Sequence, residues 1–383
     1  MDSVESVRAA LARLDASEQL GAVVWRDDAA VLAEAATHDR PPRCITVKDW
    51  IEVAGMPCEG ESSIRTGRVP TRDATVVARL RAAGSVVIAK TQPGAEHPVH
   101  GRCFHPLDAG RTPGASSSGE GALLGAGASS LGLGSDSGGS IRLPAAWCGA
   151  VGLKPSFGLV PVTGHFPRVG GRHDGRTVIG PMATTVADVA WALSVIAGPD
   201  DRDPDCVPVG LGNSGTVAIE GLRVGVLNGD DLDGVAPSTL SATQRAVDLL
   251  VGGGAVTVDP LASLVAESLD ITQRYWGRSH LSGADAHQQL VDWDRFRVRL
   301  ERESARFDIV VSPVVAEVAP AFRALDGNDF RFMLPWSLTG WPAISVPFGV
   351  DKPTGLPLAV QIAAPRWHDH VVVAVAAALE GRG

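Results

Sequence analysis

The sequence predicts an α/β protein in which a mixed β-sheet is covered by helices on both faces. Short apolar runs rich in valine and isoleucine alternate with longer segments whose apolar residues recur at helical spacing. The 383 residues are 45% hydrophobic and 20% charged, a balance typical of a folded globular chain. No clear linker divides the chain, so we expect one domain over residues 1–383 with a weakly patterned region at about 200–305.

The first elements follow from local patterns. Alanine, leucine and acidic residues at helical spacing predict helices at 3–14 and 27–37, and Gly84 ends a third helix at 74–84. Continuous apolar runs predict strands, and the first of them leads directly into Lys48. These strands are expected at 44–47, 85–90 and 131–134.

The same criteria apply to the second half of the chain. Apolar runs predict strands at 222–227, 308–314, 343–349 and 358–364. Helical spacing predicts helices at 185–197, 238–251, 283–304 and 367–380. Glycine, proline, arginine and aspartate dominate 161–181 and 198–218, which we expect to be loops.

Charge and composition exclude several classes of function. The formal net charge is −9 and no long basic run occurs, which argues against nucleic-acid and anionic-membrane partners. No apolar stretch reaches the roughly 18 residues needed to span a bilayer, and the amino-terminal segment does not resemble a signal peptide. The five cysteines are scattered and odd in number, so we expect no disulfide framework and a cytoplasmic location.

The segment GSDSGGS at 134–140 raises the question of function, because glycine and serine this dense occur in linkers, phosphate loops and catalytic turns. A dinucleotide loop does not fit, since Ser130 stands where the third glycine would follow Gly125 and Gly127. A Walker loop needs a lysine, and none occurs in 91–153. The nucleophile elbow fails as well, because Asp136 occupies the position of its serine, and no Ser-x-x-Lys is present.

Two histidine-containing stretches are candidates for a metal site. The possible ligands are His97, His100, Cys103, His105, His368 and His370. Their spacing resembles no common zinc motif, and histidines in a loop beside an active site or on the surface explain them equally well. We expect neither a metal nor a cofactor.

Several separated segments together resemble the amidase signature family. The longest is PGASSSGEGALLGAGASSLGLGSDSGGSIRLPAAWCGAVGLKPSFGLVP at 113–161. CITVKDWIEVAGMP and VVIAKTQPGAE precede it, and VIGPMATTVADVAWAL, DIVVSPV, LTGWPAISVPFG and GLPLAVQIAAP follow it in the family's order. The resemblance covers about 4–380, clearly in 40–197 and 308–380, and implies the amidase signature fold.

The resemblance also implies catalytic roles. Ser140 matches the nucleophile, Ser116 the bridging serine whose peptide bond is cis, and Lys48 the base. The oxyanion hole corresponds to Ser137, Gly138, Gly139 and Ser140. The chemistry is consistent, because a serine hydroxyl needs a neighbouring base and a lysine serves only when burial lowers its pKa. Only four of the 34 basic residues are lysines, and an arginine at position 48 could not be deprotonated.

Other residues are expected to support this site. Asp136 and Arg142 flank the nucleophile, and Ser117 with Glu120 fits a capping box for the following helix. Ser135 is expected to be structural. Two residues depart from the family's usual G-G-S-S-G-G, namely Ala115 before the bridging serine and Ser118 in place of a glycine.

The chain is shorter than most family members at about 200–305, which implies a reduced cover over the substrate. We expect Glu96, Trp147, Trp336 and Trp341 as candidates for the substrate pocket, with core packing as the alternative for the tryptophans. The implied activity is hydrolysis of a small-molecule amide through a serine acyl-enzyme, releasing ammonia or an amine. Two alternatives remain open: the ammonia-donating component of a glutamine amidotransferase, and an acyl transferase with an amine or hydrazine acceptor. A homodimer is kept open as the assembly.

Overall fold

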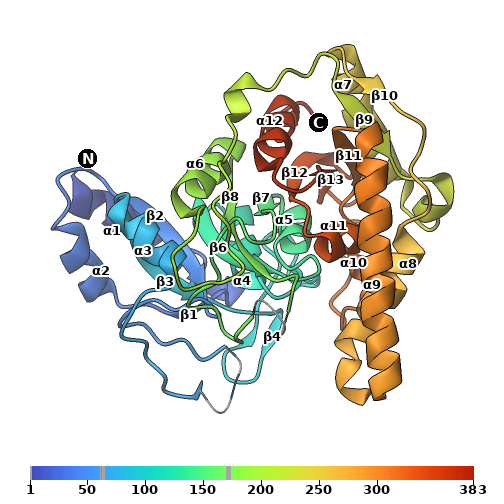
Figure 1. Cartoon of the computed structure of the whole chain (residues 1–383). Helices are drawn as coiled ribbons and strands as arrows, with labels where there is room; N and C mark the ends of the chain where they lie inside the picture. Colours follow the sequence, from blue (N-terminus) through green and yellow to red (C-terminus); the bar gives the residue numbers. More distant parts are fainter. Residues whose placement is uncertain (1, 61, 63–64, 170–173) are drawn as a thin grey trace.

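The computed structural model describes residues 2–60, 62, 65–169 and 174–383, and its centre is one mixed sheet of 11 strands (Figure 1). The strand order is β1-β3-β2-β6-β8-β7-β12-β13-β11-β9-β10. β3, β2 and β6 run parallel to one another, as do β11, β9 and β10, whereas the strands between these groups pair antiparallel. The α/β class and the mixed sheet are therefore confirmed.

The strands of this sheet lie close to the apolar runs in the sequence. Their bounds are β1 (Val23–Trp25), β2 (Arg43–Lys48), β3 (Ser85–Thr91), β6 (Leu131–Asp136), β7 (Val151–Lys154), β8 (Val178–Ala183), β9 (Arg223–Val226), β10 (Val256–Thr257), β11 (Ile309–Pro313), β12 (Ala343–Val350) and β13 (Pro357–Ala363). A separate two-stranded hairpin consists of β4 (Glu96–His97) and β5 (Gly101–Arg102).

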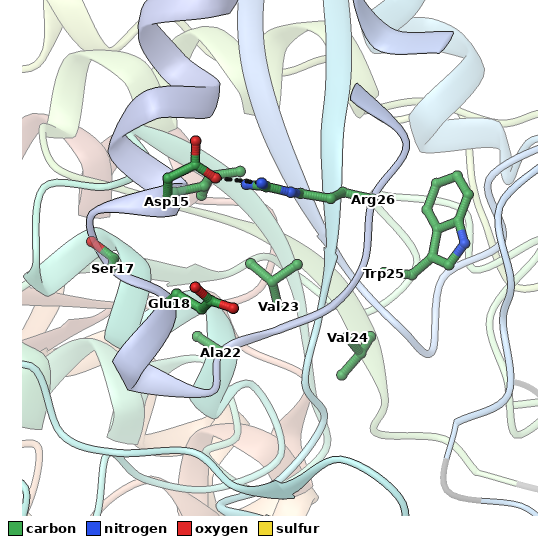
Figure 2. Close-up of a pocket in the computed structure, with 9 residues that line it drawn as sticks. Asp15, Ser17, Glu18, Ala22, Val23, Val24, Trp25 and Arg26 are labelled. Atoms are coloured by element: carbon green, nitrogen blue, oxygen red, sulfur yellow. Dashed lines mark hydrogen bonds and ion pairs between the residues drawn. The ribbon is translucent and has the colours of Figure 1, made fainter. Parts of the chain in front are cut away.

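At one edge of the sheet, β1 borders a surface hollow of about 270 Å³. Arg26 reaches across the hollow to the carboxylate of Asp15, and Glu18 and Trp25 also line it (Figure 2). None of the serines predicted for catalysis lines this hollow, so it is separate from the site described below.

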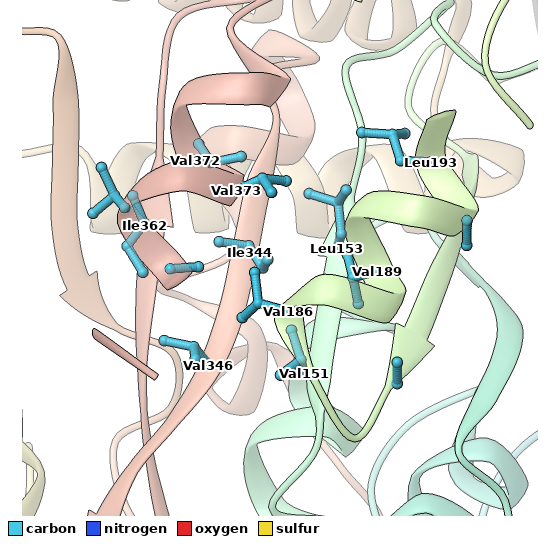
Figure 3. Close-up of a cluster of buried hydrophobic side chains, with 14 of the residues drawn as sticks. Val151, Leu153, Val186, Val189, Leu193, Ile344, Val346, Ile362, Val372 and Val373 are labelled. Carbon is cyan, nitrogen blue, oxygen red and sulfur yellow. The ribbon is translucent and has the colours of Figure 1, made fainter. Parts of the chain in front are cut away.

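One face of the sheet is covered by helices from both halves of the chain. They are α3 (Thr75–Ala82), α6 (Val186–Ile196), α7 (Pro237–Gly252) and α12 (Asp369–Leu379). Every second strand residue points toward them, as shown by Val87 of β3, which packs here while Val86 and Ile88 pack on the opposite face. Figure 3 shows Val186, Val189 and Leu193 of α6 and Val372 and Val373 of α12 near strand residues Val151, Leu153, Ile344, Val346 and Ile362.

The opposite face carries the remaining long helices in two groups. Near β3 lie α1 (Ser3–Asp15), α2 (Asp28–Ala35) and α4 (Ser118–Gly125). Near β11, β12 and β13 lie α5 (Arg142–Cys148), α8 (Val265–Trp276), α9 (Gly283–Glu303), α10 (Gly327–Phe330) and α11 (Leu334–Thr339). Within the described residues, no helix is both long and apolar enough to cross a membrane.

Some elements differ from the sequence prediction. β8 begins at Val178, inside the stretch expected to be a loop, because its Gly180 and Pro181 are typical of loops although the strand is central and fully buried. α8 was not predicted, since its buried face includes polar residues such as Ser268 and Thr272. α5 is buried on every side and so lacks the helical period on which the prediction relied.

Candidate active site

The predicted catalytic residues converge at the end of two adjacent strands. Lys48 is the last residue of β2, Ser135 lies near the end of the neighbouring parallel strand β6, and Ser116 and Ser117 directly precede α4. Because parallel strands present their carboxyl ends at one edge, these side chains meet there. Lys48 Nζ lies 2.7 Å from Ser116 Oγ, 3.0 Å from Ser135 Oγ and 3.3 Å from Ser117 Oγ.

Lys48 is fully removed from solvent, with a relative exposure of 0%. Besides the three hydroxyls, its Nζ lies 4.0 Å from the centroid of the Trp50 ring. A buried lysine surrounded by hydroxyls and an aromatic face is in the kind of environment that favours a neutral amine over an ammonium. This placement is what a lysine base requires.

The nucleophile candidate and the bridging serine share one cavity. Ser140 lies in the turn between β6 and α5, and both Ser116 and Ser140 line a cavity of about 350 Å³. Both residues are partly exposed, while Lys48 lies buried behind Ser116. No hydrogen bond joins the hydroxyls of these two described serines, so Ser116 is linked to the lysine but not to Ser140 in this structure.

The turn at 137–140 provides backbone donors beside Ser140. The Gly139 N–H donates to Asp136 Oδ1 at 2.7 Å, so this amide is already used, in contrast to the expectation that it serves an oxyanion. Within the described part of the chain, the amides of Ser137, Gly138 and Ser140 have no acceptor. Gly139 has φ +135°, and a Cβ there would lie 2.6 Å from Met333 Sδ, so this position requires glycine.

Asp136 and Arg142 form a bidentate ion pair that holds this turn. Both side chains are fully buried, with Arg142 Nη2 3.0 Å from Asp136 Oδ1 and Nε 3.1 Å from Oδ2. The guanidinium also donates to Met333 O, Gln361 Oε1 and Ser337 Oγ. Burial opposes ionisation of Asp136, but Arg142 more than offsets it and holds the pKa of the carboxyl below its ordinary value. The pair therefore ties the nucleophile turn to α11 and β13.

The capping box expected from Ser117 and Glu120 is not formed. The Ser117 side chain makes no cap hydrogen bond, and its Oγ instead contacts Lys48 Nζ and the backbone of Ser135. The Glu120 carboxylate turns toward the sheet and accepts hydrogen bonds from Thr46 and Thr91. Ser135 is also more than structural, because its hydroxyl is a direct partner of Lys48.

The peptide bond at the bridging serine differs from the expectation. Among the described residues, the cis bond is Phe166–Pro167, and the bond before Ser116 is trans. For a non-prolyl bond the trans form is lower in free energy by about 3–4 kcal/mol. Ala115 is buried against apolar side chains, and its carbonyl accepts a hydrogen bond of 2.6 Å from Ser118 Oγ, so both departures from the family motif are accommodated locally.

The cavity wall comes mainly from residues that the sequence did not single out. Glu96 lines the cavity as expected, but Trp147, Trp336 and Trp341 are each at most 2% exposed and belong to the core. The side chains that line the cavity instead include Phe322, Arg323, Leu325 and Phe330. They lie far from the serines along the chain and in an irregular segment, so no local motif indicates them.

Trp276 extends this aromatic surface over the nucleophile turn. A Cβ placed on Gly138 would lie 3.2 Å from its ring, and the ring packs edge-to-face on Phe330 with centroids 5.8 Å apart. Trp276 is the last residue of α8, the helix that was not predicted, and its side chain is 41% exposed. It is therefore accessible at the site.

The histidine-rich stretches have other contacts. His97 Nδ1 accepts the backbone N–H groups of Val99 and His100, and the His105 ring is hydrogen-bonded to Trp147 O. Over residues 2–60, 62, 65–169 and 174–383, no three His, Cys, Asp or Glu side chains are grouped so that they could hold a metal ion.

Comparison with known proteins identifies the family. The family model described as Amidase matches residues 5–277 and 276–373. The chain belongs to the amidase family. One of the two kinds of chain that form a glutamyl-tRNA(Gln) amidotransferase, from Chloroflexus aurantiacus (strain ATCC 29366 / DSM 635 / J-10-fl), is 37% identical over 281 residues, which cover 67% of this chain and 56% of that protein. The amidase chain thus spans little more than half the length of that relative.

Two further similarities cover more of the matched protein. A 1-carboxybiuret hydrolase subunit from Pseudomonas sp. (strain ADP) is 31% identical over 384 residues, covering 88% of this amidase chain and 83% of that protein. The solved structure of 6-aminohexanoate cyclic dimer hydrolase with its substrate superposes with a TM-score of 0.86 at 25% identity, covering 100% of this chain and 94% of that chain. These matches establish the amidase fold across the chain.

Proposed function

We propose that the protein is an amidase that hydrolyses a carboxylic amide through an acyl-enzyme on Ser140. The observation that carries the proposal is the contact of 2.7 Å between buried Lys48 and Ser116, which shares its cavity with Ser140. A base, a hydroxyl relay, a nucleophile and free backbone donors are thus placed together. This set of groups is suited to acyl transfer.

The proposed reaction has two halves. In the first, the Ser140 oxygen attacks the amide carbonyl while its proton passes through Ser116 to neutral Lys48, and the free amides of the 137–140 turn bind the oxyanion. Lys48 then returns the proton through Ser116 to the leaving nitrogen, the C–N bond breaks, and the ester remains on Ser140. In the second half, water attacks this ester and releases the acid.

The relay requires Ser140 and Ser116 to form a hydrogen bond in the substrate complex. Catalytic hydrogen bonds are often long or absent before substrate binds, so their absence here is compatible with the mechanism. The Asp136–Arg142 pair keeps the turn in place while the two hydroxyls rotate. The chain therefore needs only side-chain movement to complete the relay.

The proposed substrate is a compact amide with an apolar or aromatic group. The cavity volume of about 350 Å³ lies near the lower end of the range usual for small-molecule sites. Phe322, Leu325 and Phe330 provide apolar surface, and the charge of Arg323 is balanced by Asp329 at 2.6 and 2.8 Å. A cytoplasmic location is part of the proposal and is supported by five free cysteines.

The test is intact-mass trapping of the acyl-enzyme against a panel of aromatic and aliphatic primary amides. We expect ammonia release and a transient mass increase that peptide mapping assigns to Ser140, and Ser140→Ala should lose both. Retained hydrolysis by purified Ser140→Ala would contradict the proposal. Added hydroxylamine or hydrazine distinguishes acyl transfer, since an acceptor that competes strongly with water yields a hydroxamate or hydrazide in place of acid.

A second candidate function is release of ammonia within a glutamine amidotransferase, which the 37% identity to the Chloroflexus aurantiacus protein favours. The same triad would then release ammonia from glutamine for a partner. Glutaminase activity that depends on a co-purifying protein would support this function. Hydrolysis of simple amides by the isolated chain, without glutaminase activity, supports the hydrolase.

A further inference from the structure

A carboxyl group lies buried against the sheet beside Lys48. Glu120, in the first turn of α4, has 0% exposure, and the same helix directly follows Ser116 and Ser117. Its Oε2 accepts a hydrogen bond of 2.6 Å from Thr46 Oγ1, and its Oε1 accepts one of 2.8 Å from Thr91 Oγ1. The mechanism above assigns no role to this acid.

Both threonines are placed by the strand that carries Lys48. Thr46 precedes Lys48 by two residues on β2, so the two side chains leave the same face of the sheet. Thr91 is the residue of β3 that lies opposite Lys48 in the parallel register. Glu120 therefore binds the two residues that flank the lysine along and across the sheet.

The sheet leaves space for this carboxyl group. Gly132 of β6 is the register partner of Thr46, and any side chain at position 132 would collide with Glu120 Oε2. The Thr46 hydroxyl also lies 3.2 Å from Ser129 Oγ, which extends the polar group. A buried acid with two hydroxyl donors and a glycine opposite is a built site, because an unpaired buried carboxylate would be strongly destabilising.

The charges around Glu120 come from two strands. Lys48 of β2 and Lys90 of β3 both act on the carboxyl, but Lys90 Nζ is paired with Asp49 Oδ1 at 3.0 Å. On β6 the charged residue is Asp136, which Arg142 neutralises. Burial raises the pKa of Glu120 to about 7, although the hydrogen bonds from Thr46 and Thr91 and the two lysines act in the opposite direction. Its charge thus changes near neutral pH.

We propose that Glu120 is a positioning residue of the catalytic site, which orients Lys48 through Thr46 and Thr91 and sets by its charge the pH range in which Lys48 accepts a proton. The inference rests on the proposed function. A carboxylate near the lysine favours the ammonium form, so removing the negative charge should lower the pKa of Lys48. The base would then become active at lower pH.

The decisive experiment follows the lysine directly, because the chain has few lysines to assign. Protein labelled with [6-13C]lysine is titrated by NMR, and the Lys48 signal is assigned by its loss in Lys48→Arg. In Glu120→Gln we expect this signal to titrate at a pH lower by about 0.5 to 1 unit than in wild type. The acid limb of kcat/KM for a hydrolysed amide should move in the same direction.

A matched control and a second variant keep the test decisive. Asp369→Asn removes another fully buried carboxyl, which is bonded to Ser156, and should leave the Lys48 titration unchanged. If Glu120→Gln does not fold, Thr91→Val removes one donor to the carboxylate, disfavours its charge and should shift Lys48 in the same direction. An unshifted Lys48 signal in the folded variant overturns the inference.

The two proposals fail in different ways. If no amide is hydrolysed but the Lys48 signal shifts, the hydrolase proposal fails and the coupling between Glu120 and Lys48 stands. If hydrolysis proceeds and Glu120→Gln lowers kcat without moving either the Lys48 titration or the acid limb, Glu120 is only a structural residue.

Discussion

Lys48 Nζ lies 2.7 Å from Ser116 Oγ, at the end of a fully buried side chain that is also within 3.0 Å of Ser135 Oγ. The strand β2 brings the amine to this point, and the start of α4 brings the hydroxyl. Because Ser116 also lines the cavity of Ser140, this contact connects the interior base to the accessible nucleophile. The catalytic predictions below depend on it.

Lys48→Arg should abolish amide hydrolysis, with a loss in kcat/KM of about 10³-fold or more. Arginine keeps the positive charge but cannot be deprotonated in a protein, so it cannot accept the Ser116 proton. Steady-state ammonia release measures the loss. Lys352→Arg, at an exposed turn, is the matched control and should behave as wild type. Turnover within tenfold of wild type in Lys48→Arg would exclude this lysine as the base.

Ser135→Ala should lower kcat/KM by about 10- to 100-fold with a smaller change in KM, because a hydrogen bond to a group that becomes charged is worth about 1.5–3 kcal/mol. The hydroxyl holds Lys48 Nζ toward Ser116 and stabilises its protonated form. Kinetics on one good amide substrate measure the change. Ser194→Ala removes an exposed hydroxyl of α6 and should have no effect. Equal activity of the two variants would show that Ser135 is structural.

Phe330→Ala should raise KM for an aromatic amide roughly tenfold while changing kcat/KM for a small aliphatic amide about twofold or less. The ring lines the cavity and packs against Trp276, so its loss removes apolar contact on one side of the substrate. Trp25→Ala, in the separate hollow of Figure 2, is the control for loss of an aromatic side chain. A proportional loss for both amides would mean that the wall does not select the substrate.

Lys154→Met should make the protein more stable at and below neutral pH. Burial lowers the pKa of Lys154 to about 7 from its ordinary 10.5, with Arg142 adding to the effect. Between these values the unfolded chain is protonated and the folded one is not, so the wild type loses stability as the pH falls from about 10 to about 7. Methionine has no proton to bind, so its advantage should grow through this window and stay constant below it.

Urea unfolding at several pH values measures this stability difference. Lys352→Met, at an exposed site, should give a difference independent of pH. A constant difference for Lys154→Met between pH 7 and pH 10 would contradict the perturbed pKa.

The sequence predicted the order of most strands and helices because their signals are local. The helix expected at 3–14 is Ser3–Asp15, and the strand expected at 85–90 is Ser85–Thr91. Elements without a local signal were missed: α5 is buried on all sides, and β8 contains the Gly180 and Pro181 that usually mark a loop.

The sequence by itself determined the candidate triad and the family, because Lys48, Ser116 and Ser140 lie in short segments whose residue types are dictated by chemistry and close backbone approach. Only the tertiary structure decided the surroundings of that triad. Ser135 and Glu120 acquire their roles because β2 and β6 lie side by side and α4 packs on them, and Trp276 and Phe330 reach the nucleophile turn from distant segments. Such contacts come from long-range packing, which leaves no pattern in the neighbouring sequence.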